Sequence, residues 1–319
     1  GVPKELWASQ KAGGSKKPFI YTDEQNNIIT IKIRQDGRQG GKATPANAVS
    51  QTVLGSINSV DFPHAFAAKE EMRAWKFLQL NPEDLREPTR QEIGARDTIT
   101  SSGKNLAAAL FRIKQNDEYA LIQVARKLTN FLPNFTEVNV LDDKANKQFL
   151  ILIKGEDGRE FSSRVLSEGT LRLLALCIFQ YDEQHKGLLC FEEPENGIHP
   201  FRIKSMSELL KDLSGNFSDM EFPLRQVIVN THSPALVNEL IQWKDDKTVS
   251  VWLSQLNTFI DEIEGKRVKL KATKILPVIK ENSRQLSLPF SEAERKFTLT
   301  EVIKYLQTAD TENARAELQ

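Results

Sequence analysis

The sequence predicts an α/β fold in which a parallel sheet carries helices, with an antiparallel β layer and a helical insertion beside it. The apolar run at residues 188–191 favours a short buried strand, and residues 226–230, with Val227, Ile228 and Val229 at their centre, favour a second apolar strand. Between them, apolar residues recur at helical spacing after Pro200, which predicts a helix. A strand, a helix and a strand in this order imply a right-handed parallel crossover.

The first half of the chain predicts the antiparallel layer and the helical insertion. Alternating residues and the turn signal Asp157-Gly158 favour strands at residues 28–33, 135–141, 148–154 and 160–165. Apolar residues at helical spacing favour helices at 61–80, 106–113 and 120–131. The small or polar stretches 40–50 and 90–102 favour irregular structure.

In the second half, residues 171–179 are apolar on every face except at Arg172, which predicts a buried helix. A further strand is expected at 249–253, and the pattern weakens beyond 270, with a short polar helix or tail at 300–319. We expect three domains: the antiparallel and helical part at 1–165, the parallel α/β part at 166–260, and a C-terminal extension at 261–319.

Composition excludes several classes of protein. The 319 residues include 43 basic and 43 acidic side chains, so a strongly nucleic-acid-binding surface is not expected overall, although a local patch stays open. Cys177 and Cys190 lie in apolar runs, which favours core residues of a reduced, cytoplasmic protein. No apolar run reaches the roughly 18 residues that a membrane-spanning helix needs.

Two adjacent carboxylates, Glu192 and Glu193, come directly after the apolar run 188–191. Like charges repel, so such a pair is costly to bury. Ligands bind at the carboxyl ends of strands in open parallel sheets. The pair therefore predicts a magnesium-dependent nucleotide site, in which Glu192 holds Mg²⁺ while Glu193 orients and deprotonates the attacking water. The alternative is a solvated acidic loop.

Two other segments are expected at the same site. Ser167 and Gly169 precede the buried helix, and a helix start leaves backbone N–H groups free for a phosphate. The alternative is an ordinary N-cap at Ser167 with a close-packed Gly169. His232 follows the strand at 226–230 and can reach a γ-phosphate from the same sheet edge; the alternative is an ordinary loop histidine.

Together these motifs resemble the ABC-type ATPase heads of the SMC and RecF class. WKFLQLNPEDLREP at 75–88 and SSGKNLAAAL at 101–110 look like the AAA-21 group of predicted ATPases, several of which serve bacterial anti-phage defence, as in Septu-like systems. The resemblance implies that LSEGT at 166–170 is the signature motif and LLCFEE at 188–193 the Walker B strand. It implies that His232 is the switch histidine. It also implies nucleotide-binding roles for Ser167, Glu168, Gly169 and the D-loop residue Asn196.

The chain departs from this class in two ways. Glu192 stands where a Walker B strand usually has Asp, although EEPE is familiar in the AAA-21 group. No stretch matches the phosphate loop, Gly-x4-Gly-Lys-Ser/Thr. Residues 37–43 fail because Gly37 is one residue too close to Gly41 and Ala43 cannot bind magnesium, and 102–105 also fail. We therefore expect an N-terminally incomplete P-loop NTPase head that lacks its Walker A part, in keeping with a first residue that is not Met.

The resemblance also implies ATP and Mg²⁺ as cofactors and a homodimer of heads that ATP holds together. The leading hypothesis is an ATPase subunit that controls a separate effector, such as a nuclease, in phage defence. The chain lacks Asp-x-Asp and any histidine after His232, which disfavours a nuclease within it. A RecF-like DNA-binding repair ATPase and a non-hydrolysing assembly scaffold are the alternatives. Nucleic acid is left open as a partner, and a membrane is not expected.

Overall fold

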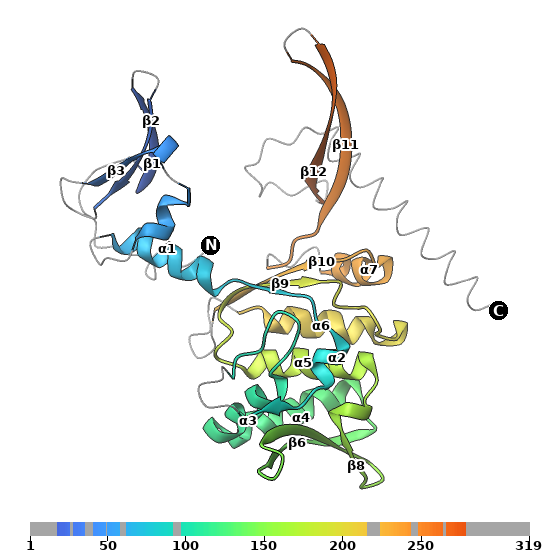
Figure 1. The fold of residues 1–319 in the computed structure, drawn as a ribbon. Coiled ribbons are helices and arrows are strands. Elements are labelled where there is room, and N and C mark those ends of the chain that lie inside the picture. Colours follow the sequence, from blue (N-terminus) through green and yellow to red (C-terminus); the bar gives the residue numbers. More distant parts are fainter. Residues whose placement is uncertain are drawn as a thin grey trace, which may run out of the picture. The chain divides into compact units, whose positions relative to one another are not determined.

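The computed structural model describes residues 18–25, 28–35, 41–48, 50–57, 62–91, 97–215, 224–243, 248–263 and 266–278 (Figure 1). The chain divides into two compact units. The first comprises Gly1–Phe77, Glu183–Cys190 and Ser214–Ile228; the second comprises Leu78–Asp182, Phe191–Leu213 and Val229–Gln319. The segment expected as a helix or tail at 300–319 lies outside the described residues.

The first unit contains a three-stranded antiparallel sheet in the order β1-β2-β3, followed by a helix. Its elements are β1 (Ile20–Gln25), β2 (Ile28–Arg34), β3 (Gly41–Pro45), the 3-10 turns η2 (Ala46–Ala48) and η3 (Val53–Ser56), and α1 (Pro63–Ala74). A small core of Ile33, Val53, Ile57 and Ala65 holds this part together. The strand expected at 28–33 is confirmed.

Two expectations for this region are wrong. Residues 41–45 are not a loop, because they pair with β2 and gain backbone hydrogen bonds that their small polar side chains do not signal. The helix expected to reach residue 80 ends at Ala74, and β4 (Lys76–Leu78) follows it. Phe77 is exposed and Leu78 is buried, so this short apolar run alternates like a strand.

The central sheet has the order β10-β9-β4. Its two longer strands are β9 (Gly187–Glu192) and β10 (Arg225–Asn230). The Gly187 amide donates to the Leu224 carbonyl and the Glu193 amide to the Asn230 carbonyl, so the two strands advance together and are parallel. The 3-10 turn η5 (Pro200–Arg202) and α6 (Ile203–Leu213) connect them. The predicted strand, helix and parallel strand are confirmed.

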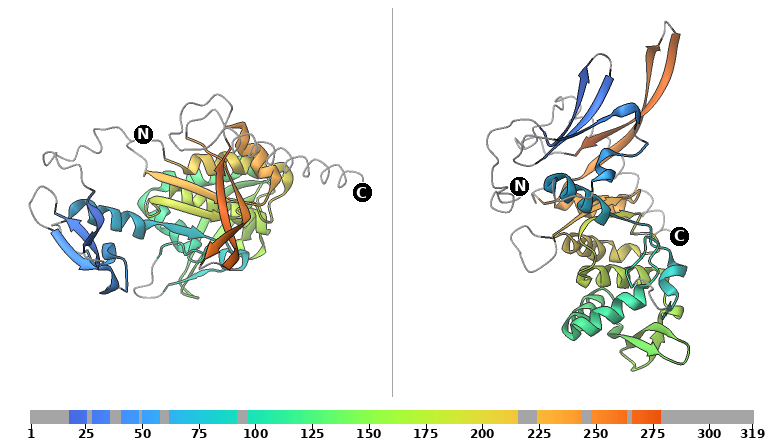
Figure 2. Two further views of the ribbon diagram at one scale, coloured as in Figure 1. Left: turned by 90° about the horizontal axis from the view of Figure 1, so that it is seen from above. Right: turned by 60° about the vertical axis from the view of Figure 1, so that its left-hand side comes forward.

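In the second unit, helices lie around α5 (Glu168–Tyr181), and an antiparallel sheet lies beyond α3 and α4 (Figure 2). Residues 173–179 of α5 are entirely buried, as the apolar run predicts. Besides α6, the other described helices of this unit are α2 (Pro82–Arg86), α3 (Leu106–Asn116), α4 (Glu118–Phe131) and α7 (Pro234–Gln242). The sheet contains β5 (Thr89–Arg90), β6 (Phe135–Asp143), β7 (Gln148–Gly155) and β8 (Glu160–Ser162), in the order β5-β7-β6 with β8 also paired to β7. The predicted α/β class, with a parallel sheet and an antiparallel layer, is confirmed.

The short strand expected at 249–253 overlaps the start of a long β-hairpin. β11 (Trp252–Ile263) and β12 (Lys266–Pro277) form a hairpin with 12 residues in each strand. The expectation that regular structure fades beyond residue 270 is therefore wrong. Most side chains on both sides of this hairpin are exposed, so no continuous buried face imposes a period of two on the sequence.

Neither cysteine in the described residues is in a disulfide. Cys177 is buried in α5 and Cys190 is half-buried in β9. Burial raises the pKa of both thiols, which disfavours the thiolate form. Within the part of the chain that the structure describes, no helix is both long and apolar enough to cross a membrane.

Candidate functional site

The acidic pair marks a sharp turn at the end of β9. Glu192 is the last residue of the strand, and Glu193 has a φ angle of 42°. A left-handed conformation is uncommon for a residue other than glycine and costs on the order of 1–3 kcal/mol. A hydrogen bond of 2.8 Å from the Glu193 amide to the Asn230 carbonyl holds the turn. Such strain concentrates at functional sites, so the turn supports a functional role for the pair.

The end of β10 and the loop after it supply polar partners to the carboxylates at the end of β9 and in the loop that follows it. Asn230 donates its side-chain amide to both oxygens of Glu192, at 2.9 and 3.0 Å. His232 places Nε2 at 3.7 Å from Glu193 Oε1, and the hydroxyl of Thr231 donates to Glu195. The predicted residues Glu192, Glu193 and His232 therefore come together at one sheet edge.

Asn196 belongs to the same cluster. Its side-chain amide donates to Glu193 Oε2 at 2.7 Å, and its backbone amide donates to the Glu193 carbonyl at 3.1 Å. One side-chain oxygen of Glu193 thus faces Asn196 while the other faces His232. This arrangement fixes the direction of the Glu193 carboxylate, which a general base requires.

The donor set fits Mg²⁺ better than a cation that needs a cage of protein ligands. Among the described residues, no three His, Cys, Asp or Glu side chains converge on one point. Glu192 and Glu193 are adjacent carboxylates at an accessible strand end. Mg²⁺ in nucleotide sites typically takes one or two carboxylates and completes its shell with water and phosphate oxygens. Glu192 is therefore the residue that could hold Mg²⁺ here.

The start of α5 packs against the loop after β9. A Cβ atom added at Gly169 would lie 2.5 Å from the Gly197 carbonyl oxygen, so only glycine fits there. Gly197 has a φ angle of 74°, and a Cβ added there would lie 2.9 Å from the Glu168 Cδ. Glu168 and Gly169 therefore lie beside the loop that carries Asn196, and close packing by itself accounts for the glycine at 169.

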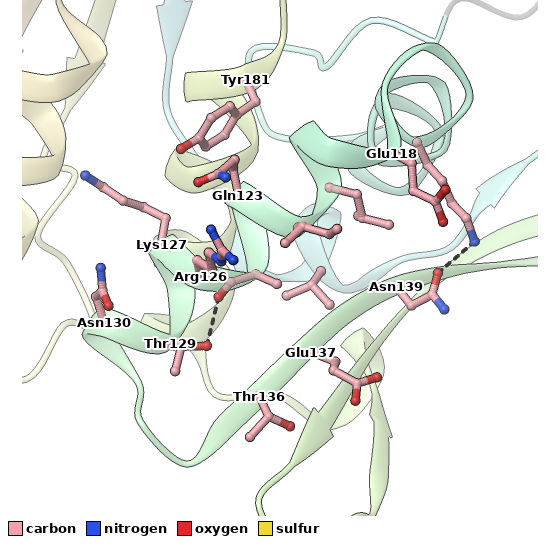
Figure 3. A pocket seen from close by; sticks show the side chains of 15 residues that line it. Glu118, Gln123, Arg126, Lys127, Thr129, Asn130, Thr136, Glu137, Asn139 and Tyr181 are labelled. Atoms are coloured by element: carbon pink, nitrogen blue, oxygen red, sulfur yellow. Dashed lines mark hydrogen bonds between the residues drawn. The ribbon is translucent and has the colours of Figure 1, made fainter.

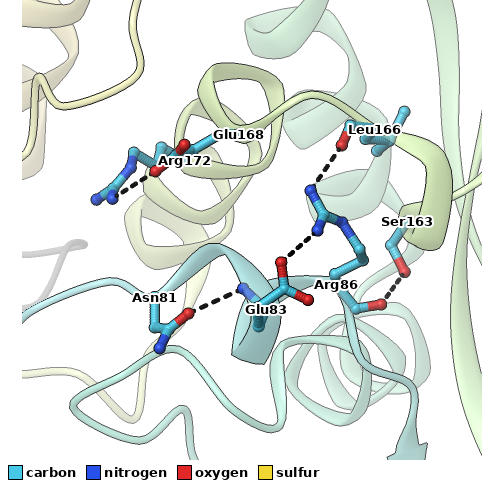
Figure 4. A network of polar contacts seen from close by, with 7 residues as sticks. All are labelled: Asn81, Glu83, Arg86, Ser163, Leu166, Glu168 and Arg172. Carbon is cyan, nitrogen blue, oxygen red and sulfur yellow. Dashed lines mark hydrogen bonds and ion pairs between the residues drawn. The ribbon is translucent and has the colours of Figure 1, made fainter.

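Ser167 is the N-cap of α5, and its Oγ accepts a hydrogen bond from the Thr170 amide at 3.3 Å. The segment before it is held to α2 (Figure 4). Arg86 donates to the Leu166 carbonyl at 3.3 Å, and the Ser163 hydroxyl donates to the Arg86 carbonyl at 3.0 Å. Glu168 pairs with Arg172 of the same helix at 3.1 Å. Nothing in the sequence identifies Arg86 as the anchor of this segment.

Two substitutions at Ser167 separate its capping role from a role at a nucleotide. Ser167→Ala removes the cap and is expected to lower the free energy of unfolding by about 1 kcal/mol. Ser167→Asp keeps a capping oxygen but adds a negative charge, so it should preserve stability while weakening a γ-phosphate contact. Urea unfolding and ATP-dependent dimerisation of both variants test this. Normal dimerisation of Ser167→Asp would contradict a nucleotide contact.

Neither glycine-lysine segment forms a phosphate loop. Gly41-Lys42-Ala43 lies within strand β3. Gly103, with a φ angle of 97°, lies in a turn before α3, where an added Cβ would lie 2.4 Å from the Leu85 Cδ2. A phosphate loop joins a strand directly to a helix, and neither segment does so.

A groove of about 870 Å³ lies between α4 and β6 (Figure 3). The residues that line it are separate in the sequence from the acidic pair. Polar side chains of α4 and β6 face it, with Tyr181 of α5 at one end. The ammonium group of Lys114 on its wall donates to Asn139 at 2.9 Å. None of the predicted site residues lines the groove, so it gives no support to the nucleotide site.

Sequence reasoning missed three residues of the cluster: Asn230, Thr231 and Glu195. A sequence signal exists for Asn230 and Thr231, because they are polar residues at the end of an apolar strand. This strand end is predicted to lie at the same sheet edge as the acidic pair. Burial of Glu195 could not be anticipated, since its neighbours at 192 and 193 are also glutamates and remain more accessible.

Comparison with known proteins gives one family match. The model of the family AAA_21, described as "AAA domain, putative AbiEii toxin, Type IV TA system", matches residues 21–238. No curated protein matches the chain at a significant level.

Among solved structures, an SMC ATPase studied for ATP-driven dimerization and DNA-stimulated activation is 13% identical, with a TM-score of 0.34, and covers 60% of this chain and 96% of its own. The SMC head domain from Thermotoga maritima is 11% identical, with a TM-score of 0.31, and covers 81% and 72%. An SMC head bound to the C-terminal winged-helix domain of ScpA is 8% identical, with a TM-score of 0.38, and covers 77% and 68%. All three are remote similarities.

Proposed function

The chain belongs to the AAA_21 family, and from this premise we propose that it is an ATP-binding and hydrolysing subunit of the ABC and SMC type. ATP-dependent dimerisation of two such heads would control a separate effector, such as a nuclease, in bacterial anti-phage defence. One observation carries the proposal: Glu192, Glu193, Asn196 and His232 converge where two parallel strands end. That edge of an α/β sheet is where ligands bind.

Each residue of the cluster has a role in this proposal. Glu192 would hold Mg²⁺, which would supply charge neutralisation to the phosphates of ATP. Glu193 takes a proton from the attacking water, and Asn196 keeps the Glu193 carboxylate in position. His232, whose side chain is 80% exposed, contacts the γ-phosphate and leaves it when the phosphate departs.

The start of α5 serves the second head of the dimer. Ser167, Glu168 and Gly169 are proposed to contact the γ-phosphate of a nucleotide that the facing head holds. The position of Ser167 as the N-cap of α5 supports this, because a helix start leaves backbone N–H groups free for a phosphate. We further propose that the Walker A loop comes from residues outside this sequence, since neither glycine-lysine segment has the required strand-loop-helix form.

The test uses the full-length gene product. We expect ATP hydrolysis that stops when Mg²⁺ is chelated, and ATP-dependent dimers detected by light scattering after gel filtration. Glu192→Ala should raise the Mg²⁺ concentration needed for half-maximal activity by about tenfold or more, because one carboxylate ligand is lost. A protein that binds no ATP at millimolar concentration would instead favour the non-hydrolysing assembly scaffold.

A RecF-like DNA-binding repair ATPase is the second candidate, and strand β12 favours it. Its sequence, KRVKLKATKILP, has five basic residues and no acidic residue. A concentration of positive charge on one strand is the electrostatic requirement for binding phosphate backbones. Strong stimulation of ATP hydrolysis by DNA would favour repair, whereas co-purification of a nuclease would favour defence.

A further inference from the structure

We propose that Glu195 is a positioning residue whose buried carboxylate fixes the loop of His232 to the loop of Glu193. The inference rests on the proposed function, because it assigns a task to a residue beside the proposed base and the proposed γ-phosphate sensor. It also makes a structural claim about the two loops that can be tested without ATP.

Glu195 is buried, with only 8% of its surface exposed. One of its carboxylate oxygens accepts a hydrogen bond from the Thr231 hydroxyl. The other, Oε2, is inaccessible to solvent and has no hydrogen-bond partner among the described residues. Burying a carboxylate with one oxygen unsatisfied is unfavourable, so the fold retains Glu195 at a cost to stability.

The Thr231 hydroxyl has two partners and therefore a single orientation. It donates to Glu195 and accepts from the Ser233 amide at 2.9 Å. Ser233 is in turn the N-cap of α7, where its Oγ accepts from the Leu236 amide at 3.3 Å. His232 lies between these two anchored residues, so its backbone is held on both sides although its ring is exposed.

The loop after β9 is also closed on itself. The Ile198 amide donates to the Glu195 carbonyl at 2.9 Å, and the Asn196 amide donates to the Glu193 carbonyl at 3.1 Å. A displacement of Glu195 would therefore also displace the turn that orients Glu193. Of the pairs Asn230–Glu192 and Thr231–Glu195, the second is the more buried, because Glu195 is buried whereas Asn230 and Glu192 are exposed. A lower dielectric around Glu195 strengthens this hydrogen bond, so the pair holds the two loops together beyond the point where the Glu193 amide bonds the Asn230 carbonyl.

Conservative and disruptive substitutions of Thr231 and Glu195 test the role of this pair in ATP hydrolysis. In the full-length protein, Thr231→Val removes the hydroxyl at nearly constant volume and should lower kcat for ATP on the order of tenfold, with KM nearly unchanged, because the proposed base and sensor lose their relative position. Thr231→Ser and Glu195→Gln keep a donor and an acceptor and should retain most of kcat. The double variant Thr231→Val, Glu195→Ala should be no slower than the slower single variant. Thr136→Val, at an exposed residue of β6, is the matched control.

Hydrogen exchange tests the structural claim separately. Glu195→Ala frees the Thr231 side chain, so the Ser233 amide should exchange at least several-fold faster, while Glu195→Gln should leave its protection intact. If the wild-type protein hydrolyses no ATP, the proposed function fails, and the exchange rate of Ser233 still decides the positioning claim. Unchanged exchange at Ser233 in Glu195→Ala would overturn the inference, as would an active Thr231→Val enzyme with normal kcat.

Discussion

Replacing Glu193 with glutamine in the full-length protein is expected to lower ATP hydrolysis by about 100-fold or more. The amide oxygen of glutamine can still accept the hydrogen bond from Asn196, so the local geometry survives. A neutral amide cannot take the proton of the attacking water, so the ATP-bound state persists. ATP-bound dimers should therefore accumulate, which gel filtration with light scattering and a phosphate-release assay measure together.

The matched control for this change is Glu160→Gln, which makes the same chemical substitution at an exposed residue of β8. It should change neither the hydrolysis rate nor the dimer population. If Glu193→Gln hydrolyses ATP at the wild-type rate, Glu193 is not the general base. If hydrolysis falls but no dimer accumulates, ATP does not hold two heads together.

Replacing Arg112 with alanine is expected to lower the free energy of unfolding by about 3–5 kcal/mol. The Arg112 guanidinium donates to both oxygens of Asp182, at 2.8 and 3.0 Å, and its Nε lies 2.6 Å from Asp97. The side chain of Asp182 is fully buried. Removal of the arginine leaves the buried Asp182 carboxylate without its main ion-pair partner. The uncompensated buried charge is what makes the loss in stability large.

Arg159→Ala is the control for Arg112→Ala. Arg159 also pairs with an aspartate, Asp157, but both side chains are mostly exposed, at 79% and 54%. Exposed pairs contribute little, so this variant should lose at most about 1 kcal/mol. Urea unfolding of both variants, with unchanged m-values, makes the comparison. Equal losses would show that burial of Asp182 does not govern the strength of its pair.

The parallel part of the fold could be predicted because its signals are local. Residues 188–191 and 227–229 are apolar without interruption, and α5 is apolar around almost its full circumference. These patterns can be identified from the local sequence alone. β3 could not be predicted because its small and polar side chains carry no strand pattern, and β4 because it is three residues long and pairs with β9, far along the chain. The β11–β12 hairpin was missed because few of its side chains are buried.

The candidate site was predictable only in part, for a related physical reason. The carboxylates at 192 and 193 are conspicuous because charge at the end of an apolar strand is costly. Asn230, the partner of Glu192, and Thr231, the partner of Glu195, become meaningful only when two parallel strands end side by side. The close approach of Gly169 to Gly197 is likewise a property of packing, which residue type alone does not reveal.

The β11–β12 hairpin bears on how the protein behaves in concentrated solution. Leu256, Ile260 and Ile275 lie on one face of it and are 58–66% exposed, in a sheet with two strands among the described residues. Apolar strands of this kind are templates for strand addition by other copies, and lysines along an edge oppose that process by mutual repulsion. We therefore expect the lysines of β12 to oppose self-association of the protein by charge repulsion. High salt screens this charge, so self-association through the hairpin is expected to increase with salt concentration.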